Sequence, residues 1–171
     1  CIQDDGQTLT PSDPIIIGES SVEELQEKYV FTYYSSLSSA VTDVNNGTIG
    51  TNADTTKEDA TAGIYTNNGQ VYVVLLKDTT LDTRISPSVD MTINLGGNTL
   101  SYNGNDTMVM YVTSGNLIID GRLEGSKVEL ISTNENLNHF AQIAAGNTTI
   151  IGGIYNISLN SEIGVGFTVV N

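Results

Sequence analysis

The chain has 171 residues, 39% of them hydrophobic, which suits one domain of ordinary size with or without a tail. It carries six lysines and arginines against twenty aspartates and glutamates, so its formal net charge is −14. Such a surface repels phosphate backbones, which excludes nucleic acid as an expected partner, and it repels anionic polysaccharides unless a bound cation intervenes.

Residues 1–19 contain prolines, glycines and acidic residues, a composition typical of an extended arm or linker. Within this arm, Ile15, Ile16 and Ile17 form a short apolar patch that we expect to anchor the chain by adding as a strand to another surface. Cys1 is the only cysteine, so no disulfide can form within the chain. Two interpretations of Cys1 stay open: the point where a longer precursor was cut or numbered, or the acylated first residue of a bacterial lipoprotein.

Residues 20–70 are expected to form a helical cap region with a polar loop. Ser20 and Ser21 precede a capping-box pattern at residues 22–25, which predicts a short helix to about Tyr29.

A second helix follows, because apolar residues recur at i, i+3, i+4 and i+7 and so share one helical face. These residues are Leu37, Ala40, Val41 and Val44. Ser35 or Ser36 can cap its start, and Asn46-Gly47 can close its end in a left-handed turn. The small, polar residues 48–70 indicate a long loop.

From residue 71 onward the pattern changes to short apolar runs separated by turn-forming residues. None of these runs is long enough to cross a bilayer. Strands are predicted at residues 71–76, 81–85, 91–95, 108–112, 117–119, 128–131, 141–144, 149–151 and 166–170. Because no helix-length pattern lies between them, a βαβ sheet is excluded, whereas a β-sandwich stays open as an alternative.

One phrase, a β-branched run closed by glycine, occurs three times. The copies are Thr92-Ile93-Asn94-Leu95-Gly96-Gly97, Leu117-Ile118-Ile119-Asp120-Gly121 and Thr149-Ile150-Ile151-Gly152-Gly153. Their closing glycines lie about 24 and about 32 residues apart, within the repeat range of stacked solenoids. The phrase therefore predicts a coil that winds on itself through residues 71–171.

These segments resemble the right-handed parallel β-helix proteins of the pectin-lyase-like class. The resemblance lies in the second predicted helix with residues 73–81, and in residues 92–100 and 115–121. It implies an all-β right-handed parallel β-helix, preceded by a capping α-helix and the extended arm. The polar, threonine- and asparagine-rich sequence is most similar to the non-enzymatic members in phage fibres, spikes and bacterial surface proteins.

The chain stops at Asn171 in what reads as the middle of a strand. A solenoid left open there would expose apolar core and unpaired backbone groups. We therefore expect either that the natural chain continues or that another subunit covers this end, with a homotrimer as the leading expectation.

No catalytic or metal site is predicted. Asp120-Gly121-Arg122 can be read as a fragment of a lyase site or as a solvated turn salt bridge, and the second interpretation is favoured. His139 is the only histidine, and one histidine with one cysteine cannot build a zinc site. No cofactor is expected, with Ca²⁺ left open because the turn at residues 103–106 is rich in oxygen ligands but lacks EF-hand spacing.

Four tyrosines are candidates for a sugar-binding platform, since aromatic rings stack on sugars: Tyr33, Tyr34, Tyr65 and Tyr102. Partial burial at strand ends is the competing interpretation. The sequence thus favours a non-enzymatic β-helical fibre, spike or capsid-decorating protein of a bacteriophage, on the virion surface, with a host glycan as ligand. The alternatives are a β-helix polysaccharide lyase or hydrolase, and a lipoprotein or adhesin on the bacterial cell surface.

Overall fold

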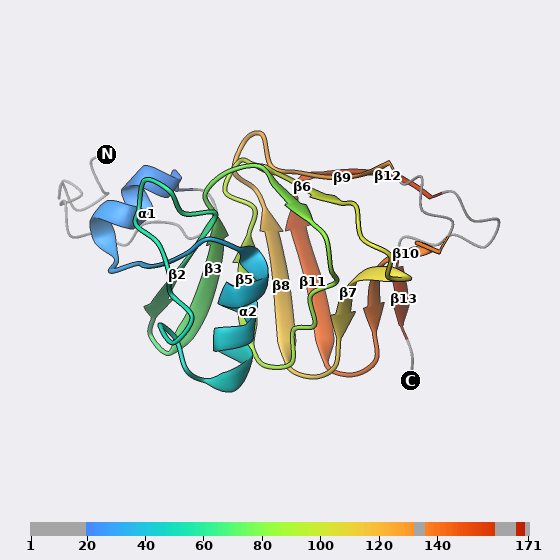
Figure 1. The fold of residues 1–171 in the computed structure, drawn as a ribbon, viewed down its shortest axis with the longest axis horizontal. Coiled ribbons are helices and arrows are strands. Elements are labelled where there is room, and N and C mark those ends of the chain that lie inside the picture. Colours follow the sequence, from blue (N-terminus) through green and yellow to red (C-terminus); the bar gives the residue numbers. More distant parts are fainter. Residues whose placement is uncertain (1–19, 132–135, 160–166, 170–171) are drawn as a thin grey trace, which may run out of the picture.

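The computed structural model describes residues 20–131, 136–159 and 167–169. Strands dominate these ranges, with the short helix α1 (Val22–Lys28) at one end of an elongated molecule and the helix α2 (Leu37–Asn46) in front of the six-stranded sheet (Figure 1). The predicted arm, with Cys1 and the isoleucines at residues 15–17, lies outside the described residues.

The strands form three sheets of six, four and three strands. In spatial order, the six-stranded sheet holds β1 (Thr32–Tyr34), β2 (Ala62–Asn67), β3 (Gln70–Leu75), β5 (Met91–Asn94), β8 (Asn116–Gly121) and β11 (Asn147–Gly152). The four-stranded sheet holds β12 (Ile154–Ser158), β9 (Lys127–Ile131), β6 (Thr99–Tyr102) and β4 (Thr79–Leu81). The three-stranded sheet holds β13 (Phe167–Val169), β10 (His139–Ile143) and β7 (Met108–Val112). From β5 to β13, consecutive strands enter the six-, four- and three-stranded sheets in turn.

Both predicted helices are present. In α1 (Val22–Lys28), the Ser21 side chain accepts a hydrogen bond from the Glu24 N–H, as the capping box requires. In α2 (Leu37–Asn46), Ser36 caps the start, and Gly47 ends the helix with φ of 66°. The apolar face of α2 is buried in the main core, and the helix lies in front of the six-stranded sheet near β3 and β5 (Figure 1).

The prediction that residues 48–70 form one long loop is wrong, because β2 lies within this range. β2 and β3 form an antiparallel hairpin, in which Asn67 pairs with Gln70. The two residues between them, Asn68 and Gly69, have φ of 50° and 77°, which matches the right-handed twist of the strands. The hairpin adds β1 at its other side, also antiparallel.

The three copies of the repeated phrase lie side by side in parallel register. Ile93 pairs with Ile119, and Ile119 pairs with Ile150. Ile93 and Ile119 are completely buried, whereas Ile150 in the edge strand β11 is 38% exposed. At the closing turns, a Cβ on Gly121 would lie 2.8 Å from the Cα of Gly153, so these two backbones approach too closely for a side chain.

The prediction of an all-β right-handed parallel β-helix is wrong. The structure is an α/β sheet fold with mixed and parallel sheets and two short helices, and the described residues form no closed solenoid. Its largest sheet is mixed, because β1, β2 and β3 pair antiparallel while β3, β5, β8 and β11 pair parallel. The repeated β-branched run that ends in glycine indicates a strand followed by a turn, which occurs in many parallel sheets. It does not indicate whether the sheets close into a solenoid.

Candidate functional site

An aromatic stack lies on the β2–β3 hairpin, in an apolar cluster separate from the main core. Tyr65 and Tyr72 are opposite each other in the antiparallel ladder, and their ring centroids are 4.8 Å apart at 9° between planes. Tyr29 stacks on Tyr65 at 4.6 Å, and Phe31 at 5.1 Å. Because Leu25 of α1 joins the same cluster, the helix and the stack together cover this part of the sheet.

The stack borders a groove that crosses β3, β5, β8 and β11. It encloses about 140 Å³, and we call it the Tyr72 groove. Its lining residues are Tyr72, Thr92, Ile118, Asp120, Arg122 and Ile151. Parallel register explains this set: Tyr72 pairs with Thr92 and Thr92 with Ile118, so the three side chains form one row across the sheet.

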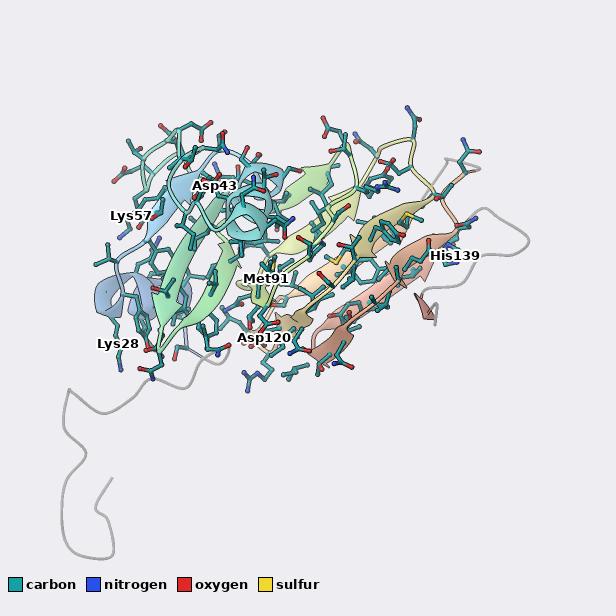
Figure 2. All side chains as sticks on the ribbon, turned by 90° about the horizontal axis from the view of Figure 1, so that it is seen from below. Lys28, Asp43, Lys57, Met91, Asp120 and His139 are labelled. Carbon is teal, nitrogen blue, oxygen red and sulfur yellow. The ribbon has the colours of Figure 1, made fainter. Side chains whose placement is uncertain are left out.

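Asp120 and Arg122 form a bidentate ion pair in this groove. The Arg122 Nε donates to Oδ1 at 3.1 Å, and its Nη2 donates to Oδ2 at 2.9 Å. The Arg122 backbone N–H also donates to Oδ1 at 3.1 Å. The carboxylate is 2% exposed and the guanidinium side chain 31% exposed, so this is a half-buried pair and not the solvated turn salt bridge that the sequence favoured. Figure 2 shows Asp120 near the middle of the molecule's length, between Lys28 and His139.

Three buried polar atoms near this pair have no hydrogen-bond partner in the described part of the chain: the hydroxyls of Tyr65 and Tyr155 and the Asn94 Nδ2. Asn94 is the register neighbour of Asp120. Burial raises the pKa of Tyr65, and the nearby Tyr72, Tyr29 and Asp120 raise it further. Unsatisfied buried groups are rare in proteins and call for a partner such as a water or a ligand.

Three of the four tyrosines predicted to bind a glycan are buried, so they do not form a surface platform. The Tyr34 hydroxyl donates to Asp43 at 2.9 Å, and that of Tyr102 donates to Asp106 at 2.9 Å. Tyr65 is the centre of the aromatic stack. Tyr33 is half-buried and accepts a hydrogen bond from the Gln26 side chain at 3.4 Å.

Neither the place of Tyr72 in the groove nor the burial of Asp120 is among the predictions made from the sequence. Both side chains alternate with core residues along their strands, so a period of two would have placed them on the opposite face once the core side was known. His139, expected in a polar loop, is the first residue of β10, and its Nδ1 contacts the Asn138 Oδ1. Within the described ranges, no three His, Cys, Asp or Glu side chains gather to hold a metal ion.

Comparison with protein-family models, with curated proteins and with solved structures gives no match. The resemblance to the pectin-lyase-like class therefore stays a prediction based on the sequence. No helix in the described ranges is long and apolar enough to cross a membrane. The protein is thus rich in strands and has a small groove that is lined by an aromatic ring and a bidentate ion pair.

Proposed function

We propose that this protein is a non-enzymatic attachment protein that binds a surface glycan through the Tyr72 groove. The observation that carries the proposal is the meeting of the Tyr72 ring with the half-buried Asp120–Arg122 pair in one groove. An aromatic face packs on the C–H face of a sugar. The Arg122 guanidinium, which the buried Asp120 carboxylate holds in a fixed position, donates to sugar hydroxyls with charge-assisted strength.

The expected ligand is an uncharged glycan. With a net charge of −14, the protein repels polyanionic chains, and the guanidinium in the groove is already neutralised by Asp120. Thr92 adds a hydroxyl to the row between Tyr72 and Ile118. A polymer that runs across the strands would meet this row in successive positions.

The setting of this attachment protein is also part of the proposal: a phage virion surface, with a bacterial cell surface as the alternative. We propose a homotrimer, supported by the apolar side chains at the sheet edges. Ile150 in β11 is 38% exposed and Ile154 in β12 is 59% exposed, and contact with another subunit would bury both. Light scattering on the purified chain tests this point, and a monomer at micromolar concentration would contradict it.

The glycan proposal is tested by screening the chain against an array of neutral and acidic bacterial surface glycans, followed by calorimetry on each hit. Tyr72→Ala is expected to weaken binding about tenfold, or about 1.4 kcal/mol. Thr92→Trp, which fills the groove and leaves the stack intact, is expected to abolish it. Tyr111→Ala removes a half-buried ring from β7 and serves as the matched control for the neutral glycans. Binding only to acidic glycans, or wild-type affinity in both groove variants, would overturn the proposal.

A further inference from the structure

A second groove lies between α2 and the segment that precedes β5. It encloses about 290 Å³. Four of its lining residues, Ser38, Val41, Thr42 and Asn45, recur at i, i+3, i+4 and i+7 and so form one face of α2. The other four are Thr83, Arg84, Ile85 and Ser86. We call it the Arg84 groove.

The frame of this groove is fixed by Asn45. Its Nδ2 donates to the Ser86 carbonyl oxygen at 2.9 Å, and its Oδ1 accepts from the Ser88 N–H at 2.9 Å. These two bonds join α2 to a segment about 40 residues away in the chain. Val41 and Ile85 are 2% and 3% exposed, so the groove has a buried apolar base.

The polar lining of the groove is largely uncommitted. Among the described residues, the hydroxyls of Ser38, Thr83 and Ser86 make no hydrogen bond. The Thr42 hydroxyl donates to the Ser38 carbonyl oxygen at 2.8 Å and keeps its acceptor capacity. The groove can therefore offer several hydroxyl groups to a ligand.

Arg84 is one of the residues that line this groove, and its guanidinium donates to no carboxylate in the described part of the chain, although the hydrogen bond from its backbone N–H and its charge both help to lower the pKa of the nearby Asp106. The guanidinium lies over the Tyr111 ring, 5.2 Å from the centroid, and its Nη1 is 3.5 Å from the Met108 Sδ. Asp106, the acidic neighbour, accepts the Arg84 backbone N–H at 2.9 Å and not a guanidinium bond. The other arginine of the chain, Arg122, is paired with Asp120, so the two arginines have different environments.

From this arrangement we infer a second binding site, for a small hydroxylated carboxylate. A planar guanidinium fixed on an aromatic ring matches the two oxygens of a carboxylate in a bidentate pair. One guanidinium neutralises one negative charge, whereas a phosphate dianion would keep excess charge near a protein of net charge −14. The volume lies at the lower limit of ligand pockets, which suits a molecule of the size of a sugar acid or one terminal residue of a chain.

The test is titration of the ¹⁵N-labelled full chain with four probes, followed by NMR. The probes are D-gluconate, acetate, D-glucose and inorganic phosphate, which separate carboxylate, hydroxyl and general anion binding. D-gluconate is expected to shift the Ser38, Thr42, Thr83 and Ser86 amides saturably, at least fivefold more tightly than acetate or phosphate, with no shift from D-glucose. Non-saturating shifts, or phosphate binding as tight as D-gluconate, would overturn the inference.

Three variants give the test its specificity. Arg84→Gln is expected to abolish the D-gluconate shifts, and Arg84→Lys, which keeps the charge but loses the fork, to weaken binding at least fivefold. Lys57→Gln removes the same charge from an exposed position at the end of the molecule that holds α1 (Figure 2) and is expected to bind as the wild type does. If Arg84→Gln and Lys57→Gln weaken D-gluconate binding equally, the effect comes from the overall charge of the protein, which would contradict a specific site at Arg84. Tyr72→Ala should leave D-gluconate binding unchanged, so the proposal for the Arg84 groove is tested independently of the proposal for the Tyr72 groove.

Discussion

The hydroxyl of Tyr34 donates a 2.9 Å hydrogen bond to the Oδ2 of Asp43, and both side chains are completely buried. The same Oδ2 accepts the Asn52 N–H at 2.9 Å, and Oδ1 accepts the Asn52 Nδ2 at 2.6 Å. The Tyr34 hydroxyl in turn accepts the Gly50 N–H at 2.8 Å. Among the described residues no cation pairs with this buried carboxylate, so neutral donors stabilise it, and it ties the loop after α2 to β1.

We predict that Tyr34→Phe lowers the free energy of unfolding by about 1–3 kcal/mol, because it leaves a buried carboxylate with one donor fewer and the Gly50 N–H without its acceptor. Urea unfolding at neutral pH measures the loss. Tyr102→Phe is the matched control, since its hydroxyl also bonds an aspartate, Asp106, but at a less buried position. A loss for Tyr34→Phe no larger than that of the control would contradict the role given to Asp43.

Stability is predicted to fall in acid because of the same carboxylate. Burial by itself raises the pKa of Asp43, but hydrogen bonds from Asn52, Tyr34 and Gly50 outweigh it and hold the pKa below the ordinary value of 3.8. A carboxyl group with a depressed folded-state pKa contributes stability that is present above about pH 5 and lost as the pH falls through the folded-state value. Urea unfolding from pH 7 to pH 2.5 should show this decline. In Asp43→Asn the decline should be shallower, and an unchanged slope would show that other carboxylates cause it.

The helices and many strands could be predicted from the sequence because their signals are local. The four apolar positions of α2 repeat with the helical period, and the Ser36 cap and Gly47 bound them. The strand at residues 108–112 is observed with the predicted limits, as β7. β2 is not among the predicted strands, because the loop expected from the polar residues 48–61 is extended to residue 70. The Asn68-Gly69 pair between two apolar runs is nevertheless a strong hairpin signal.

The groove could not be predicted because it depends on pairing between distant strands. Tyr72, Thr92 and Ile118 come together only through the register of β3, β5 and β8. The burial of Asp120 likewise depends on residues outside its own strand. The position of a tyrosine near a turn does not indicate whether its ring lies on the core face or the solvent face of the sheet. For this reason the tyrosines predicted to bind a glycan include buried rings and leave out Tyr72.

Substitution of Gly96 by alanine is predicted to destabilise the protein more than the same substitution at Gly47, although both glycines have a left-handed backbone. The φ of Gly96 is 63°, and a Cβ there would press against the Leu75 carbonyl oxygen in the neighbouring strand β3. Gly47 has a similar φ of 66°, but a Cβ would meet nothing within 4 Å. Gly47→Ala should therefore cost about 1 kcal/mol, the penalty of the conformation alone, and Gly96→Ala at least about 2 kcal/mol. Thermal and urea unfolding of the two variants measure the difference. Equal costs would mean that the sheet shifts to admit the methyl group.

Tyr65 allows the ring and the hydroxyl of one side chain to be separated. Tyr65→Phe removes a buried hydroxyl that has no hydrogen-bond partner in the described part of the chain, so the free energy of unfolding should stay unchanged or rise by up to about 1 kcal/mol. Tyr65→Leu removes the ring between Tyr29 and Tyr72 and should cost about 2–4 kcal/mol. Urea unfolding tests both values. If Tyr65→Phe destabilises the protein by more than about 1 kcal/mol, the hydroxyl has a partner, and an ordered water between Tyr65 and Asp120 is the first to look for by crystallography. If it is neutral but weakens glycan binding, the hydroxyl is instead reserved for the ligand of the Tyr72 groove.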